Sequence, residues 1–302
     1  MRISSNQYQS SLQLSMQNSG SQMAETLQKM SSGQRLLAPS EDPIASVRLL
    51  RLQREESSLD QYRDNIGALR QQLTQNESLL DGISQRLRDV SDILTAAANM
   101  PPRDDLKAMA TPLESLRDTI LYAANTKNSE GRYLFSGSAV KSETIKQDDS
   151  QPAGSRYSFG GNTDKQKVVV GDGVTETANV TLESMAPLLN QLDATIATLK
   201  SPTLDHTDPA VGQQVRDAMA AVSAALDNVS SRISELGGSQ NVLRSLSASH
   251  DNISLANQQS IRDLGGLDYA TAYLELNGLS MAVQASMKAY GRVSQLTMFD
   301  VI

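Results

Sequence analysis

The sequence contains no cysteine and no tryptophan, and aromatic residues make up only 4% of its 302 positions. Without cysteine, the chain can form neither a disulfide framework nor a thiolate metal site. Large aromatic side chains supply much of the mass of a globular core. A chain of this length with so few of them is therefore expected to form thin layers of helices rather than one large core.

Long apolar runs are also missing. No stretch approaches the roughly 18 uninterrupted apolar residues that a membrane-spanning helix requires. The first residues, MRISSNQYQSSLQLSMQNSG, lack the apolar segment of a cleaved signal peptide. The formal net charge of −7 gives little support to nucleic-acid binding. We therefore expect no membrane insertion and no nucleic-acid partner.

Residues that could carry catalysis are few and poorly placed. The two histidines, His206 in a turn and His250 in a helical stretch, have no metal-ligand spacing around them. The paired carboxylates Glu41-Asp42 and Asp104-Asp105 stand at predicted helix starts, where the helix dipole favours negative charge. The GDG sequence at 171–173 is a turn, because a phosphate-binding loop would need a lysine and a following helix. The sequence predicts no enzyme, and so no catalytic residue, cofactor or metal.

Apolar residues at alternating steps of three and four predict a long helix that starts at 43 and ends before 101. Asp42 can cap its start, Pro43 suits the first helical position, and Pro101-Pro102 ends it. Asn76 is the one polar member of its apolar seam. The seam consists of Leu59, Tyr62, Ile66, Leu69, Leu73, Asn76, Leu80, Ile83, Leu87, Val90, Leu94 and Ala97.

The same rhythm predicts further helices that fold back on the first. One covers 106–123, one covers 185–200, and a third, with heptad spacing over 215–243, begins after Asp208-Pro209. Gly237-Gly238 weakens the third pattern, which blurs through 245–266 and recovers near the C-terminus.

The segment 129–183 has a different character, rich in glycine, serine, threonine and aspartate. Short β-type runs within it, RYSF, KVVV and ANVTL, are separated by turn signals. We expect a small antiparallel sheet of three to five strands at one end of the helical rod.

The two ends of the chain carry sparser apolar series, separated mostly by serine, glutamine and asparagine. Such helices bury too little apolar surface alone to offset the cost of ordering the chain. We expect them to be marginal in the isolated subunit, to lie at the same end of an antiparallel bundle, and to pair with each other and with neighbouring subunits. The residues expected at this interface are Leu12, Met16, Met23, Leu27 and Met30, with Leu279, Val283, Met287 and Tyr290.

Together these segments predict a mainly α fold. It is an elongated antiparallel helical bundle or coiled coil of N- and C-terminal helices, with a small central antiparallel β domain. The predicted order is an N-terminal polymerisation helix and ordered turn (1–42), a long rod helix with a returning helix (43–130), a small β-rich insert (131–184), C-terminal rod helices (185–272) and a C-terminal polymerisation helix (273–302).

Four stretches carry a resemblance to a known family. KMSSGQRLLAPSEDPIASVRLL (29–50) resembles the N-terminal signature of the bacterial flagellin superfamily, in which a helix ends at a Ser-Ser-Gly-x-Arg turn and an acidic-Asp-Pro cap starts the next. The chain start, NSEGRYLFSGS (128–138) and the C-terminal stretch from 265 agree with it. Flagellins usually have Arg-Ile-Asn where this chain has QRLL, so the sequence looks more like the hook-associated members than the filament-forming ones.

The resemblance implies a structural subunit between hook and filament, located outside the cell in the flagellum and exported by the flagellar type III apparatus without a cleaved signal. It implies four partners: hook-associated protein 1, flagellin, further copies of the chain, and an export chaperone at the C-terminal helix. It also implies that the ordered turn contacts neighbouring subunits. The turn residues concerned are Ser32, Gly33, Arg35, Leu36, Glu41, Asp42 and Pro43.

Three other functions remain open at this point. A short flagellin would form long filaments by itself. A cytoplasmic helical signalling module would have fully folded termini and a ligand pocket. A type III needle-tip or translocator subunit would need a pair of apolar helices that insert into a membrane, and the sequence shows none.

Overall fold

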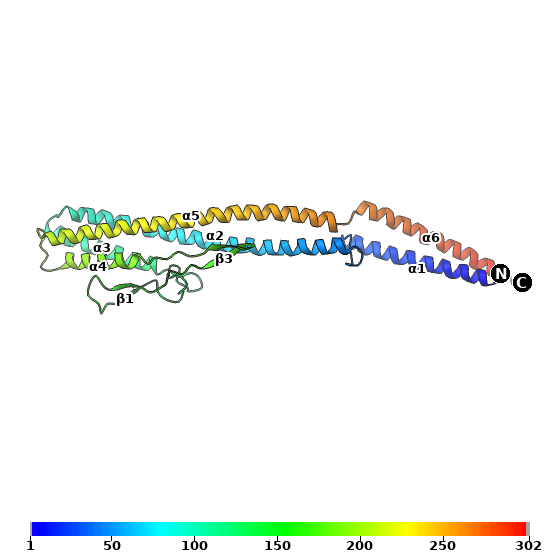
Figure 1. The fold of residues 1–302 in the computed structure, drawn as a ribbon, viewed down its shortest axis with the longest axis horizontal. Helices are drawn as coiled ribbons and strands as arrows, with labels where there is room; N and C mark the ends of the chain where they lie inside the picture. The colour runs from blue at the N-terminus through cyan, green and yellow to red at the C-terminus, as the bar shows by residue number, and fades with distance from the viewer. Residues whose placement is uncertain (1, 300–302) are drawn as a thin grey trace. The chain divides into compact units, whose positions relative to one another are not determined.

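In the computed structural model, which describes residues 2–299, the chain divides into two compact units. One unit combines the residues up to Leu59 with those from Asp251 onward, and the other is Asp60–His250. Helices α2 (Pro43–Ala98) and α5 (Pro209–Gly265) contribute to both units. The first unit also contains α1 (Arg2–Ser32) and α6 (Tyr269–Phe299) (Figure 1). The predicted fold class, mainly α with a small β region, is confirmed.

The second unit has a continuous apolar core between four helices, which are α2, α3 (Arg103–Ala124), α4 (Met185–Lys200) and α5. The predicted seam of α2 faces this core, and Leu73, Leu80 and Leu87 are fully buried. Asn76 occupies its expected seam position and is also fully buried, and neither amide atom has a hydrogen-bond partner among the residues that the structure describes. Gly237-Gly238 does not interrupt α5, because Leu236 and Leu243 on either side are buried in the same core.

Four short strands form two separate antiparallel sheets in this unit rather than one. Strands β1 (Ile145–Gln147) and β2 (Tyr157–Phe159) pair with each other, and β3 (Lys167–Gly171) pairs with β4 (Val174–Thr177). Two of the predicted runs, RYSF and KVVV, correspond to β2 and β3. The prediction for ANVTL (178–182) is wrong, because this segment forms no strand and all five of its residues are buried.

Asparagine side chains close the outer edges of the β1–β2 sheet. The amide of Asn125, at the end of α3, accepts from Ile145 N (2.9 Å) and donates to Ile145 O (2.9 Å). Asn190 of α4 makes the same two bonds with Tyr157, each of 2.8 Å. A side-chain amide thus substitutes for a neighbouring strand and satisfies backbone groups that an edge strand would expose.

The second sheet is held against α2 and α5. Asn65 Nδ2 donates to Val169 O (2.8 Å), and Nε2 of His250 lies 2.8 Å from Val170 O. The strands therefore lie along the sides of these helices and not beyond their ends. His250 is 7% exposed and its ring packs near Tyr62, so it is a core residue of the packing.

Candidate functional site

The antiparallel pair of α1 and α6 in the first unit is the first part of the candidate site. Helix α1 begins, and α6 ends, at the same end of this pair, as expected from the sequence (Figure 1). The inward positions of α1 follow steps of three and four, but they include serine and threonine. These positions are Leu12, Met16, Ser19, Met23, Thr26 and Met30.

One predicted interface residue of α1 points elsewhere. Thr26 is 5% exposed in the seam, while its neighbour Leu27 is 45% exposed. A step of three from Met23 leads to Thr26 and a step of four leads to Leu27, so hydrophobicity alone selected the wrong residue. The hydroxyl of the buried Thr26 is hydrogen-bonded, because its Oγ1 donates to Gln22 O (3.0 Å).

Helix α6 shows a similar difference near its end. Leu279 and Val283 are half-buried, but Met287 is 55% exposed and Tyr290 is 42% exposed. The half-buried positions continue instead through Ser286 and Ala289. Met287 and Tyr290 therefore lie outside the seam between α1 and α6, and both side chains are accessible to a partner.

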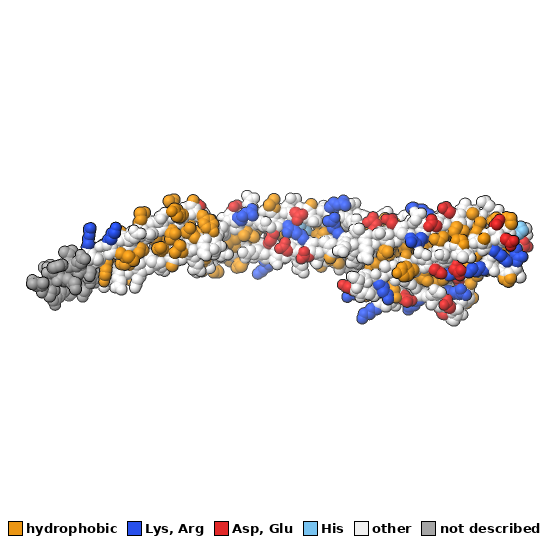
Figure 2. Space-filling model, turned by 180° about the vertical axis from the view of Figure 1, so that it is seen from behind, with side chains coloured by type: hydrophobic (Ala, Val, Ile, Leu, Met, Phe, Trp, Pro, Cys, Tyr) orange, Lys and Arg blue, Asp and Glu red, His pale blue; other side chains and the backbone are white. Residues whose placement is uncertain are grey.

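The surface of this helix pair carries little charge. Helices α1 and α6 contain three charged residues each: Arg2, Glu25 and Lys29, and Glu275, Lys288 and Arg292. Exposed apolar side chains include Leu14 (60%), Leu274 (72%) and Met281 (65%). Figure 2 shows this part of the molecule mostly orange and white, whereas elsewhere blue and red side chains alternate. Such an apolar surface is typical of a region that another protein covers.

The second part of the site is the turn between α1 and α2. Helix α1 stops at Gly33, which adopts a left-handed φ of +69° and donates its N–H to Lys29 O (2.9 Å). This αL termination favours glycine because a Cβ there is strained. A Cβ on Gly33 would also lie 3.2 Å from the hydroxyl oxygen of Tyr269. That hydroxyl donates to Met30 O (3.2 Å) and so ties the start of α6 to the end of α1.

The turn pairs with the connection between α5 and α6. Arg35 N donates to Gly265 O (2.8 Å), and Leu267 N donates to Gly33 O (3.0 Å). The Arg35 side chain adds a bond from Nε to Leu264 O (3.0 Å). Two segments that are 229 positions apart in the chain therefore form one hydrogen-bonded junction.

Glu41 closes the turn from its other side. Its Oε1 accepts from the backbone N–H groups of Leu37 and Ala38, both at 3.0 Å, and its Oε2 lies 2.8 Å from Lys29 Nζ. Lys29 also pairs with Glu25 at 2.8 Å. The hydrogen bond from Lys29 lowers the pKa of Glu41, and the bonds to Glu25 and Glu41 raise the pKa of Lys29.

The cap predicted at the start of α2 is present. Asp42 Oδ1 accepts from Ala45 N (3.0 Å), and Pro43 is the first helical residue. Asp42 Oδ2 also lies 3.6 Å from Arg35 Nη2. Asp268 performs a similar function at the start of α6, where it accepts from Thr271 Oγ1 (2.7 Å) and Ala270 N (3.0 Å).

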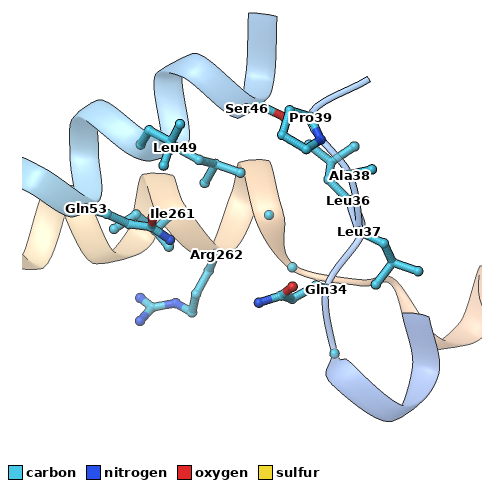
Figure 3. Close-up of a pocket in the computed structure, with 14 residues that line it drawn as sticks. Gln34, Leu36, Leu37, Ala38, Pro39, Ser46, Leu49, Gln53, Ile261 and Arg262 are labelled. Carbon is cyan, nitrogen blue, oxygen red and sulfur yellow. The ribbon is translucent and has the colours of Figure 1, made fainter. Parts of the chain in front are cut away.

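A shallow apolar groove of about 390 Å³ lies between the turn, α2 and α5. Leu36 and Pro39 contribute from the turn, Leu49 from α2 and Ile261 from α5 (Figure 3). Its backbone edge includes Gly265, where a Cβ would lie 3.3 Å from the Leu49 side chain. The groove contains no cluster of titratable side chains that could perform acid–base chemistry. It offers a contact surface.

Sequence reasoning missed the residues that lock this junction together. Tyr269 and Gly265 contact partners that are distant in the chain, so no local pattern identifies them, and Lys29 bonds Glu41 across the turn. Asp268 could have been found, because an aspartate directly before a helix is a capping signal.

Among residues 2–299, every helix is too short or too polar to span a membrane.

Comparisons with known proteins agree with this geometry. Residues 3–140 match the family described as the bacterial flagellin N-terminal helical region. The flagellar hook-associated protein 3 of Escherichia coli (strain K12) is 28% identical over 298 residues, with 94% of each chain covered.

Two solved structures extend the comparison. One from Vibrio parahaemolyticus, assigned to the flagellar hook-associated proteins, is 31% identical with a TM-score of 0.66; the match covers 75% of this chain and 100% of that one. The hook-associated protein 3 of Legionella pneumophila shares the fold, with 16% identity, a TM-score of 0.62, and coverage of 70% of this chain and 98% of that one. The chain therefore belongs to the flagellar hook-associated protein 3 family of the flagellin superfamily, and it is a structural component of the bacterial flagellum.

Proposed function

We propose that this chain is the subunit that joins the flagellar hook to the filament. It binds hook-associated protein 1 on the hook side, flagellin on the filament side, and further copies of itself in a ring or helical layer. The function is mechanical: helical chain ends polymerise, and the subunit adapts one helical assembly to the next. It is not an enzyme.

One observation carries the proposal, namely the unusual surface of the α1–α6 pair. The seam of α1 includes serine and threonine, and each helix has only three charged residues. Apolar side chains such as Leu14, Leu274 and Met281 point outward. Isolated in water this surface is unfavourable, and a layer of neighbouring helices would cover it. The similarity to the Escherichia coli hook-associated protein reaches into both helices, since it spans 94% of this chain.

The ordered turn is the second proposed contact. Ser32, Gly33, Arg35, Leu36, Glu41, Asp42 and Pro43 form or surround it. Its internal hydrogen bonds fix its shape without help from a partner, so it can present its apolar groove to a neighbouring subunit at little ordering cost.

Before assembly, the subunit would pass through the flagellar type III export apparatus and reach the exterior of the cell without a cleaved signal. An export chaperone would cover the last helix at Leu279, Val283, Met287 and Tyr290. The exposure of Met287 and Tyr290 supports this proposal, because a chaperone could reach both side chains while α1 and α6 remain paired.

A short flagellin is the second candidate, favoured by the match of residues 3–140 to the flagellin N-terminal helical region. The two functions differ in self-assembly. A flagellin forms long filaments from purified subunits, whereas a junction subunit needs hook-associated protein 1 and flagellin.

Electron microscopy of cells that lack this protein tests the proposal, with the culture medium probed for flagellin. We expect hooks without filaments and flagellin lost to the medium, both reversed when the intact gene is restored. Normal filaments in the deletion strain would contradict a junction function. Absence of flagellin from both cells and medium would point to the filament-subunit alternative.

A further inference from the structure

The first turns of α2 carry a second, outward-facing stripe that the packing of this chain does not use. The inner face of this part of the helix includes Ala45, which is 7% exposed, and the half-buried Leu49 and Leu52. The outer stripe has the same three-and-four spacing, so its residues share one face. Its members are Ile44, Val47, Arg51 and Arg54.

Two of these residues are apolar and exposed. Ile44 is 84% exposed and Val47 is 51% exposed, and the neighbouring Leu50 is 59% exposed. Packing within the chain therefore does not explain why Ile44 and Val47 are apolar. Three large aliphatic side chains within seven positions form an apolar patch beside the groove at Leu49.

The other half of the stripe is positively charged and unpaired. Arg51 and Arg54 are exposed, and so is Arg48 at the edge of the stripe. Among the described residues, none of these three guanidinium groups has a carboxylate within 4.0 Å. Arginine next to apolar side chains is enriched in protein interfaces, where its planar group pairs with carboxylates.

The charge of the rest of the chain indicates the partner. Residues 60–250 contain 24 acidic and 18 basic side chains, so this unit holds almost all of the net charge of −7. An apolar patch with three free arginines therefore complements the acidic unit of another copy. Because the stripe and the acidic unit are different surfaces, such a contact would be head-to-tail, which builds rings or open helical arrays rather than closed pairs.

We propose that the stripe formed by Ile44, Val47, Arg51 and Arg54 binds residues 60–250 of a second copy of this chain. This inference rests on the self-association in the proposed function and names the surface and the partner segment. The apolar side chains supply burial at the contact, and the arginines orient it.

The absence of cysteine from the sequence allows a clean test. Purified full-length Val47→Cys carries a single thiol, which is labelled with a benzophenone maleimide and irradiated in a mixture of natural and nitrogen-15-labelled protein. We expect a covalent dimer whose cross-linked peptides pair the two isotopes and lie in residues 60–250. The control is Leu255→Cys on α5, which lies outside both the stripe and residues 60–250, is 63% exposed against 51% for Val47, and should give no such dimer.

Charge reversal tests the arginines separately. In the labelled Val47→Cys background, Arg51→Glu with Arg54→Glu should lower the dimer yield by about tenfold or more at low salt. The control pair Arg70→Glu with Arg88→Glu introduces the same charge change on exposed positions of the same helix and should leave the yield unchanged or raise it.

Four results would overturn the inference: no dimer, cross-links into residues 1–59 or 251–302 of the other copy, a yield indifferent to Arg51 and Arg54, or flotation of the protein with anionic phosphatidylglycerol vesicles that blocks the dimer. The last would assign the stripe to a lipid surface. The microscopy of deletion cells does not use this measurement, so either hypothesis can fail while the other stands.

Discussion

The α1–α6 pair and the helices of residues 60–250 use the same apolar spacing with different side chains. In the second region the seam is mainly leucine, isoleucine and valine, and Leu73, Leu80 and Leu87 are 0% exposed. In the first, methionine and leucine alternate with Ser19 and Thr26, and most of the seam is half-buried. The same helical period thus produces a closed core in one place and an incomplete one in the other.

The two seams differ in the free energy that burial of their side chains contributes to folding. Fully burying one leucine contributes about 1.5–3 kcal/mol relative to leaving it exposed, and serine or threonine contributes far less. The four-helix region can therefore offset the cost of ordering its chain, whereas the α1–α6 pair cannot do so to the same extent. The pair is the part of the molecule that gains most from a neighbouring subunit.

Removal of the terminal helix should give the largest effect. Deleting Leu276–Ile302 takes away most of α6, leaving the seam of α1 uncovered, but it removes nothing from residues 60–250. We expect circular dichroism to show the four-helix region still folded, and filaments on cells to be lost. A truncated protein that still supports filaments would contradict the importance of the pair.

A matched pair of leucine-to-alanine substitutions would measure how much each seam contributes to the free energy of unfolding. Leu87→Ala in the closed core should reduce the free energy of unfolding by about 2–5 kcal/mol, because it leaves a cavity. Leu12→Ala in the half-buried seam of α1 should cost well under half as much in the monomer. Urea unfolding monitored by circular dichroism gives both values, and equal costs would remove the distinction between the two regions.

Asn76 is the polar exception inside the closed core. Both atoms of its amide are buried without a hydrogen-bond partner, which is unfavourable by about 1–3 kcal/mol. Asn76→Leu should therefore raise the free energy of unfolding by about 1–2 kcal/mol. The control Ser78→Leu lies in the same helix outside the seam. A destabilised Asn76→Leu protein would indicate that the amide fixes the register of the helices, as buried asparagines do in coiled coils.

The cap of α2 belongs to the turn and can be weakened without touching either seam. Asp42→Ala with Pro43→Ala removes the bond to Ala45 N and the preset first helical residue. We expect a loss of about 1–2 kcal/mol, seen as a lower melting temperature. The control Ser40→Ala lies just outside the cap, and an unchanged melting curve for the double variant would argue against the cap.

The smallest effect should be a local dependence on pH. The hydrogen bond from Lys29 lowers the folded-state pKa of Glu41 below its ordinary value of about 4.5. The stabilisation of the turn by Glu41 is therefore complete above pH 4.5 and is lost as the pH falls through the lowered folded pKa. Amide exchange at Leu37 and Ala38 should accelerate in that acidic range beyond its intrinsic rate. Glu41→Gln should abolish the pH dependence, and its persistence in that variant would assign it to another group.

The four-helix region was the more predictable of the two. Its seam from Leu59 to Ala97 could be read from the sequence because large apolar residues occupy nearly every inward position. In the α1–α6 pair the inward positions are shared with small polar residues. There the pattern selected Leu27, Met287 and Tyr290, which the fold leaves largely exposed.

By itself, the sequence determined the helices, the position of the β segment, the cap at Asp42-Pro43 and the family, because each depends on residues close together in the chain. Only the tertiary structure decided that Thr26 faces inward, that ANVTL is buried without a partner strand, and that the turn is joined to the α5–α6 connection. These outcomes depend on contacts between segments more than 100 positions apart, such as Arg35 with Leu264. The free energy of such contacts outweighs local preference, so no window of sequence contains the information.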